Sequence, residues 1–137
     1  MFTYFKIVYM DNITFKLFLF IFLAGGIGAT LRGFILYLYS KYTFKIPYAI
    51  VTVNCLATFF TIYLGLSLPL SIAFPLISGF CVALGTLSTL CSDCIIMLRQ
   101  KRFFNFVIYL FLNASLGLLS AKLALSLYDI TGALYVI

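Results

Sequence analysis

Four long apolar stretches run through this chain and constrain its fold more than any other feature. They lie at about residues 13–39, 48–67, 71–98 and 104–128, and the segments between them are short. A membrane-spanning helix needs ~20 mostly apolar residues, because the hydrocarbon core is ~30 Å thick and a helix rises ~1.5 Å per residue. We therefore predict an all-α membrane protein in which residues 1–137 form a single four-helix transmembrane domain.

The composition excludes a soluble fold. Hydrophobic residues make up 65% of the chain and charged residues only 9%, whereas soluble domains carry about 25% charged residues. In water the surplus apolar surface would be exposed and would cause aggregation. The chain is also too small to enclose a wide pore alone, so we expect it to oligomerise. The first stretch is longer than a signal-peptide core of ~7–15 apolar residues, so we interpret it as a retained span.

Basic residues gather in the two loops that four spans would place on one side of the membrane. The net charge is +6, and these loops hold Lys41, Lys45, Arg99, Lys101 and Arg102. Beside apolar spans such charges are typical of topology-setting residues next to anionic lipid headgroups, so we expect membrane lipid and no nucleic acid as a partner. The positive-inside rule places both termini outside and the basic loops in the cytoplasm. We expect a multi-pass protein of the bacterial inner (cell) membrane.

The sequence offers no residues for enzyme chemistry. Cys91 and Cys94 have C-x-x-C spacing, but the chain has no histidine and no second pair of this kind. We therefore interpret the cysteines as small hydrophobic residues. The sequence also lacks a phosphate-binding loop and a nucleophile beside a base. We expect a non-enzymatic protein. A small multidrug or cation exporter remains an alternative, although it predicts a carboxylate inside the first span, where none occurs.

Two polar residues inside the predicted spans each have two interpretations. Arg32 costs ~2.5–3.5 kcal/mol at the centre of a span; it either snorkels to the end of span one or gives an anion vestibule a positive potential. Asn54 either forms an interhelical hydrogen bond, worth ~1 kcal/mol, or presents its amide N–H groups to an anion. The sequence alone leaves both pairs of interpretations open.

A cluster of hydroxyl residues follows Gly85 in span three. Thr86, Ser88 and Thr89 either bond back to helix carbonyls or satisfy a helix that opens here and exposes carbonyl oxygens to a cation. Non-helical backbone at membrane depth is tolerated only inside protein or beside a water-filled cavity. We predict that the third helix is broken near its middle and that the break marks the functional centre.

Three motifs stand in the first three predicted spans. Residues 25–32 read GGIGATLR, residues 46–54 read IPYAIVTVN, and residues 79–93 read GFCVALGTLSTLCSD. Together they resemble the Fluc (CrcB) family of fluoride channels. The first is similar to the family's glycine-rich first-helix motif ending in arginine, and the second to its second-helix pattern with a pore asparagine. The third aligns without gaps with its third-helix pattern, G-F-x-G-G-x-T-T-F-S-T-F-S-x-E, and Asn113 and Gly117 fall where family members often carry Asn or Gly.

The resemblance implies a fluoride-specific channel that lowers cytoplasmic fluoride by passive efflux. It further implies an antiparallel, dual-topology dimer with two narrow pores. Asn54 would be the pore asparagine and Arg32 the vestibule arginine. Ser88 and Thr89 would supply pore hydroxyls.

The resemblance also implies a structural, non-transported Na⁺ at the dimer centre. Backbone carbonyls of Val82 and Gly85 would hold it, although family members usually carry Gly and Thr there. Leu87 and Leu90 depart further, because they stand at the positions of two pore phenylalanines. Phenylalanine ring edges carry a partial positive charge that contacts the anion, and leucine has no such edge.

The lost phenylalanines and the one-sided loop charge lead to a hypothesis about the partner. A subunit fixed in one orientation cannot form an antiparallel homodimer, so it would need an oppositely oriented homologue that supplies intact phenylalanines. The expected assembly is therefore a homodimer or such a heterodimer. A non-conducting paralogue of the family is the second alternative function.

Overall fold

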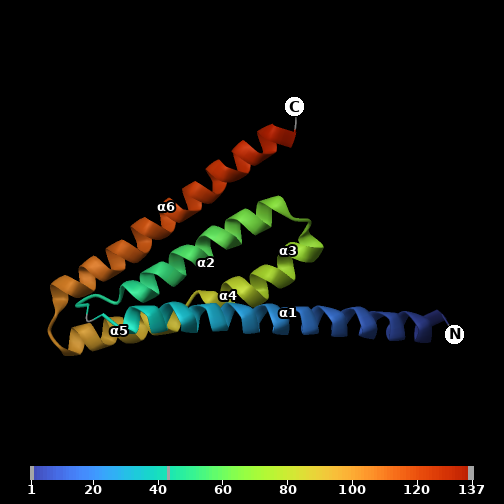
Figure 1. The fold of residues 1–137 in the computed structure, drawn as a ribbon. Helices are drawn as coiled ribbons and strands as arrows, with labels where there is room; N and C mark the ends of the chain where they lie inside the picture. Colours follow the sequence, from blue (N-terminus) through green and yellow to red (C-terminus); the bar gives the residue numbers. More distant parts are fainter. Residues whose placement is uncertain (1, 43, 136–137) are drawn as a thin grey trace.

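All regular secondary structure in the described part of the computed structural model is helical. The structure describes the backbone of residues 2–42 and 44–135 and the side chains of residues 14–42 and 44–132. In chain order the elements are α1 (Phe2–Ser40), α2 (Tyr48–Ser67), α3 (Leu70–Leu76), the π-helical segment η1 (Ile77–Cys81), α4 (Val82–Leu84), α5 (Leu87–Arg99) and α6 (Phe103–Tyr135) (Figure 1). The predicted all-α fold is confirmed.

Four stretches in the described residues are long and apolar enough to cross a membrane. They are Thr14–Ser40, Tyr48–Ser67, Leu70–Arg99 and Phe103–Gly132. The third combines α3, η1, α4 and α5. The protein is therefore a multi-pass membrane protein with four spans, as the hydropathy pattern predicts.

The first and last helices are longer than their apolar stretches. α1 begins at Phe2 and α6 continues to Tyr135, beyond the predicted spans at about 13–39 and 104–128. Figure 1 shows that these extra turns belong to the diverging ends of α1 and α6, away from the loops that precede α2 and α6. Hydropathy marks where apolar residues end, whereas a helix continues as long as its backbone hydrogen bonds do.

Glycines bring α1 into backbone contact with the first half of span three. A Cβ added at Gly28 would overlap the carbonyl oxygen of Phe80. A Cβ added at Gly79 would lie 2.5 Å from the carbonyl oxygen of Ile21. Close backbone approach through small residues is a common way for helices to associate in lipid. The glycine-rich motif of span one therefore acts as a packing surface.

The core consists of two buried clusters on either side of the break in span three. One cluster, near the basic loops, comprises Ile46, Ile50, Val51, Cys94, Met97 and Tyr109. The other, on the α4 side of the break, comprises Val53, Ala57 and Leu84. Asn54 follows Val53 on α2, so the fold places this amide between the two clusters.

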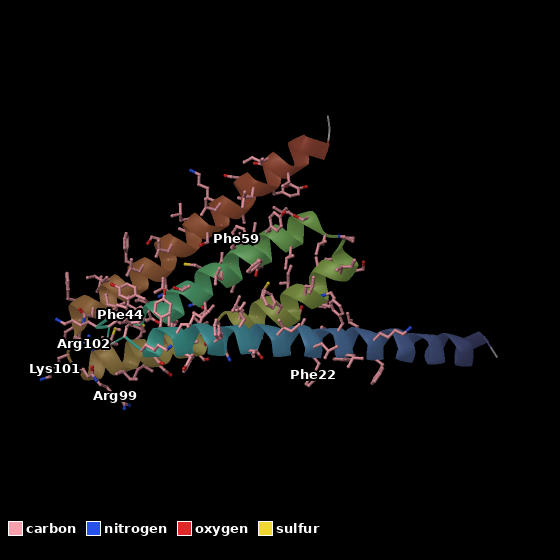
Figure 2. The ribbon with its side chains drawn as sticks, in the orientation of Figure 1. Phe22, Phe44, Phe59, Arg99, Lys101 and Arg102 are labelled. Carbon is pink, nitrogen blue, oxygen red and sulfur yellow. The ribbon has the colours of Figure 1, made fainter. Side chains whose placement is uncertain are left out.

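The outward faces of the helices are apolar and open in the single chain. Phe22 of α1 is 75% exposed and points away from the bundle (Figure 2). Phe111 and Leu118 of α6 are 69% and 73% exposed. Lipid or another subunit can cover such a surface, whereas exposure of this surface to water would cause aggregation.

Candidate functional site

The third span is interrupted at Gly85 and Thr86, as the sequence predicts. Gly85 has φ −72° and ψ 157°, and Thr86 has φ −150° and ψ 106°, so both residues are extended between α4 and α5. A Cβ at Gly85 would lie 3.0 Å from the Cβ of Ala57 on α2. Glycine is therefore the residue that lets α2 approach the break this closely.

Thr86 restarts the helix after the break. Its side-chain oxygen accepts a hydrogen bond from the backbone N–H of Thr89 at 3.3 Å, which makes it the N-cap of α5. Its hydroxyl also lies 2.8 Å from the hydroxyl of Thr89 and 3.4 Å from that of Ser88. An N-cap threonine satisfies a backbone donor that the first turn of a helix leaves unpaired. The hydroxyl cluster thus supplies hydrogen-bond partners where the helix is interrupted.

Asn54 closes the break from α2. Its side-chain Oδ1 accepts a hydrogen bond from the backbone N–H of Thr86 at 2.8 Å. Thr86 is 7% exposed, and a buried N–H without a partner costs about 1–3 kcal/mol. Asn54 therefore replaces the helix carbonyl that this N–H loses when the backbone becomes extended.

A chain of hydrogen bonds leads from Asn54 across the bundle. Asn54 Nδ2 donates to Asn113 Oδ1 on α6 at 3.1 Å, and Asn113 Nδ2 donates to the Tyr109 carbonyl oxygen at 3.0 Å. The Tyr109 hydroxyl donates to Asp93 Oδ2 on α5 at 3.1 Å. The interhelical bond expected from one interpretation of Asn54 is therefore present, and the same side chain also holds the break.

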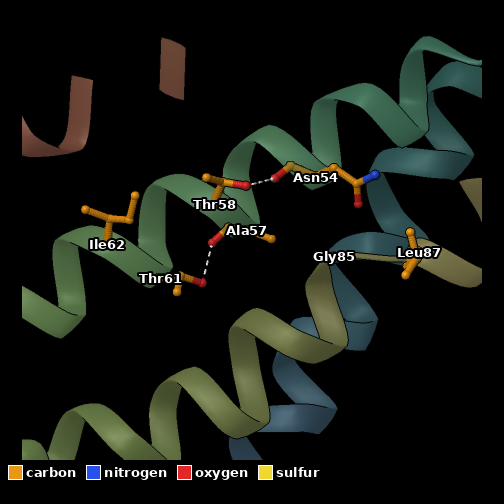
Figure 3. A pocket seen from close by; sticks show the side chains of 7 residues that line it. All are labelled: Asn54, Ala57, Thr58, Thr61, Ile62, Gly85 and Leu87. Carbon is orange, nitrogen blue, oxygen red and sulfur yellow. Dashed lines mark hydrogen bonds between the residues drawn. The ribbon is translucent and has the colours of Figure 1, made fainter. Parts of the chain in front are cut away.

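A cavity of ≈ 490 Å³ opens beside the break. Its lining residues are Asn54, Ala57, Thr58, Thr61, Ile62, Gly85 and Leu87 (Figure 3). The hydroxyls of Thr58 and Thr61 donate to the carbonyl oxygens of Asn54 and Ala57, one helical turn back, at 2.9 and 2.8 Å. Hydroxyl groups can rotate to donate elsewhere. The cavity therefore offers a row of adjustable donors along α2.

The other residues predicted for the site lie in different surroundings. Leu87 is 74% exposed at the edge of the cavity. Leu90 packs against the cluster near the basic loops. Arg32 is half-buried on α1 and does not line this cavity. Within the described side chains, no hydrogen bond or ion pair reaches the Arg32 guanidinium.

The extended backbone leaves carbonyl oxygens of the break without their usual helical partners. The Thr86 N–H, which would pair with Val82 in a continuous helix, donates to Asn54. The Thr89 N–H, which would pair with Gly85, donates to the Thr86 side chain. The carbonyls of Val82 and Gly85 therefore have no N–H one turn ahead to accept from.

Comparison with known proteins identifies the family to which this arrangement belongs. A sequence model of the family described as "CrcB-like protein, Camphor Resistance (CrcB)" matches residues 19–125. The chain belongs to the CrcB family. The region matched to CrcB contains the whole site, from Arg32 to Asn113.

A curated relative supports the CrcB assignment over most of both chains. The relative is named fluoride-specific ion channel FluC and comes from Ignicoccus hospitalis. It is 31% identical over 108 residues, which cover 72% of this chain and 84% of the relative. The similarity therefore extends over the greater part of both proteins and is not limited to one motif.

Sequence reasoning found the break of this CrcB chain but missed part of its network. In the sequence Asn113 stands out only as a family-like position, and nothing there predicts its bond to Asn54. The pairing of Tyr109 with Asp93 was not predicted either. The spacing of Tyr109 and Asn113 places both on one face of a helix, but it does not identify their partners on other helices.

Proposed function

We propose that this chain is a subunit of a fluoride-specific channel that lowers cytoplasmic fluoride by passive efflux. The CrcB family and the name of the relative support this function. The observation that carries it is the extended backbone at Gly85 and Thr86, which Asn54 holds beside a partly polar cavity. Backbone of this kind at membrane depth belongs inside protein or next to water.

The polar groups around the break suit a small anion. Fluoride is strongly hydrated, so a narrow path has to replace water with hydrogen-bond donors. Asn54 Nδ2 carries two hydrogens, and one of them bonds to Asn113. The second hydrogen and the hydroxyls of Ser88 and Thr89 are the donors that we assign to the anion path. Arg32 adds positive potential from α1, and no acidic side chain among those described pairs with it.

The oxygens of the break suit a structural Na⁺. Hard cations prefer oxygen ligands, including backbone carbonyls. The carbonyls of Val82 and Gly85 lack a helical N–H partner, and neither ligand depends on the side chain that the residue carries. In this proposal the two carbonyl oxygens coordinate the ion, whose positive charge compensates their partial negative charges. Greater thermal stability in NaCl than in KCl at equal ionic strength is the expected result, and equal stability would count against the site.

A second subunit would complete the site. Val82 and Leu87, on either side of the break, are 69% and 74% exposed in the single chain. Because lipid cannot satisfy free backbone carbonyls, another protein surface has to cover them. We assign this role to an antiparallel copy of the chain or to an oppositely oriented homologue. With an oppositely oriented homologue as the partner, the basic loops of this chain mark the cytoplasmic side of the bacterial inner membrane. In an antiparallel pair of identical chains, these loops lie on both sides.

Fluoride efflux from liposomes tests the proposed function. The purified chain is reconstituted alone and together with an oppositely oriented homologue, and external fluoride is followed with a selective electrode. Efflux by either preparation, with no efflux of chloride, supports a fluoride channel. Efflux only with the homologue, at a rate above that of the homologue alone, assigns the chain to a heterodimer. No fluoride efflux from either preparation contradicts the proposal.

A further inference from the structure

The two basic loops at one end of the molecule contain no acidic residue in their sequence. Segments 41–47 and 99–102 contain five basic residues and no Asp or Glu. Figure 2 shows Arg99, Lys101 and Arg102 together with Phe44 at this end. The nearest acidic residue along the chain, Asp93, accepts a hydrogen bond from Tyr109 inside the bundle. No ion pair among the described side chains therefore compensates the positive charge of these loops.

A cavity of ≈ 510 Å³ lies within this charged end and joins the two loops. It is lined by Phe44, Lys45, Arg102 and Asn105. Arg102 Nη2 donates to the Lys45 carbonyl oxygen at 2.6 Å. With its amide oriented to suit its neighbours, Asn105 Oδ1 accepts from Arg102 Nη2 at 2.7 Å and from Nε at 3.2 Å. These acceptors fix the position of the guanidinium, but because they are neutral they do not cancel its positive charge.

In the turn between α5 and α6, the basic residue Lys101 has an unfavourable backbone conformation. Lys101 has φ 56°, which is the left-handed region that a residue with a Cβ rarely adopts. The backbone N–H of Lys101 donates to the Leu98 carbonyl oxygen at 3.0 Å, and that of Arg102 to the Met97 carbonyl oxygen at 2.9 Å. This pair of bonds is a helix C-terminal motif in which glycine is the usual residue. A lysine therefore occupies a position where glycine would be more stable.

Aromatic residues place this cavity at the membrane surface. Phe44 packs edge-on against Tyr48 with ring centroids 5.4 Å apart, and it also contacts Tyr42 at 5.8 Å. These two tyrosines are 66% (Tyr42) and 39% (Tyr48) exposed. Tyrosine side chains collect at the level of the lipid headgroups, where the ring is in apolar surroundings and the hydroxyl reaches water. The cavity is thus at the depth of lipid phosphates.

From these observations we infer that the cavity lined by Phe44, Lys45, Arg102 and Asn105 binds the phosphate of an anionic phospholipid. The Lys45 ammonium and the fixed Arg102 guanidinium attract the phosphate, Lys101 adds charge at the rim, and Phe44 contacts the upper part of the acyl chains. This inference is independent of the proposed fluoride transport, because it concerns loop residues outside the break.

Lipid selectivity measured by electron spin resonance tests the inference. The full chain is reconstituted in phosphatidylcholine vesicles with trace spin-labelled phosphatidylglycerol or spin-labelled phosphatidylcholine. The fraction of each label immobilised at the protein gives the ratio of their association constants. We expect the wild-type protein to prefer phosphatidylglycerol several-fold and to lose this preference as NaCl is added, because salt screens exposed charges.

Two variants remove charge in structurally different ways. Lys45→Gln removes the ammonium at the cavity, and Lys101→Gly removes a charge while relieving the left-handed backbone. Each is expected to lower the association ratio by up to roughly fivefold, which corresponds to one basic residue near an anionic surface. Lys101→Gly should also unfold at a temperature no lower than wild type, so that weaker lipid binding cannot be attributed to damage.

A matched control and a competing ion complete the test. Lys122→Gln removes an exposed lysine from α6, outside the basic loops, and should leave the ratio unchanged. The inference is overturned by a wild-type ratio near one, or by a loss in Lys122→Gln equal to that in Lys45→Gln. It is also overturned if sodium phosphate abolishes the preference at an ionic strength where NaCl does not. That outcome assigns the cavity to free phosphate.

Discussion

In the first half of span three, η1 contacts α1 through glycines, whereas the second half, α5, is joined to α2 and α6 by hydrogen bonds that side chains make. Gly28 and Gly79 leave no room for a methyl group between the two backbones. On the other side of the break, Asn54 bonds to Thr86, and Tyr109 bonds to Asp93. One half is therefore positioned by steric fit and the other by polar contacts.

This difference teaches which substitutions each half tolerates. A steric contact between backbones cannot relax around an added atom, because the helices themselves would have to separate. A hydrogen bond between side chains can be exchanged for a smaller contact at a cost of about 1 kcal/mol, unless it leaves a buried group unpaired. The first half of span three, here called the glycine half, should therefore be more sensitive to added side-chain volume. The second half, here called the α5 half, should be more sensitive to the loss of hydrogen-bond donors and acceptors.

The largest expected effect comes from adding a methyl group in the glycine half. Gly28→Ala and Gly79→Ala should each lower the free energy of unfolding by roughly 1–3 kcal/mol or more, the range of an overpacked core. Thermal unfolding in detergent, followed by circular dichroism, measures the effect. Gly26→Ala is the control, because a Cβ there meets no atom within 4 Å. Equal unfolding temperatures for Gly26→Ala and Gly28→Ala would show that the helices are not in backbone contact.

The next largest effect is expected at the side-chain amide of Asn54, which bonds to the backbone between the two halves of span three. Asn54→Leu removes the acceptor of the buried Thr86 N–H and should cost about 1–3 kcal/mol, the price of an unsatisfied buried donor. Asn113→Leu removes the bond to Asn54 Nδ2 and the bond to the Tyr109 carbonyl oxygen, but it leaves the Thr86 N–H paired with Asn54 and should cost less. Under the proposed function, Asn54→Leu should also abolish fluoride efflux from liposomes. A larger stability loss in Asn113→Leu than in Asn54→Leu would contradict the role of Asn54 at the break.

The sequence predicted the fold more completely than the site for a physical reason. Span two has its predicted limits, 48–67, and span three differs by one residue at each end, because burial in lipid acts on each segment separately. The break was also predictable, since a glycine followed by hydroxyl residues is a local signal. The bonds of Asn54 to Asn113 and of Tyr109 to Asp93 depend on how the helices pack around each other. No local pattern determines that packing.

A smaller effect is expected from restoring aromatic rings at the two leucines. Leu87 is 74% exposed beside the cavity, so Leu87→Phe should fold as well as wild type. If the chain conducts fluoride, the ring edge should increase the rate of efflux, because it carries a partial positive charge. Leu90 packs against the buried cluster that includes Met97, so Leu90→Phe should lower stability by roughly 1 kcal/mol or more. Similar stability losses in both variants would show that the leucines are equally packed.

The smallest effect should come from the polar pair at the end of the hydrogen-bond chain. Tyr109→Phe removes the hydroxyl that donates to Asp93 and should lower the free energy of unfolding by about 0.5–1.5 kcal/mol, the net value of one hydrogen bond. Asp93→Asn keeps an acceptor oxygen for that hydroxyl and should cost less. The ring of Tyr109 is fully buried, so phenylalanine preserves its packing and isolates the hydroxyl. A Tyr109→Phe loss that equals or exceeds that of Asn54→Leu would mean that the hydroxyl, and not the amide at the break, is the principal polar contact of the α5 half.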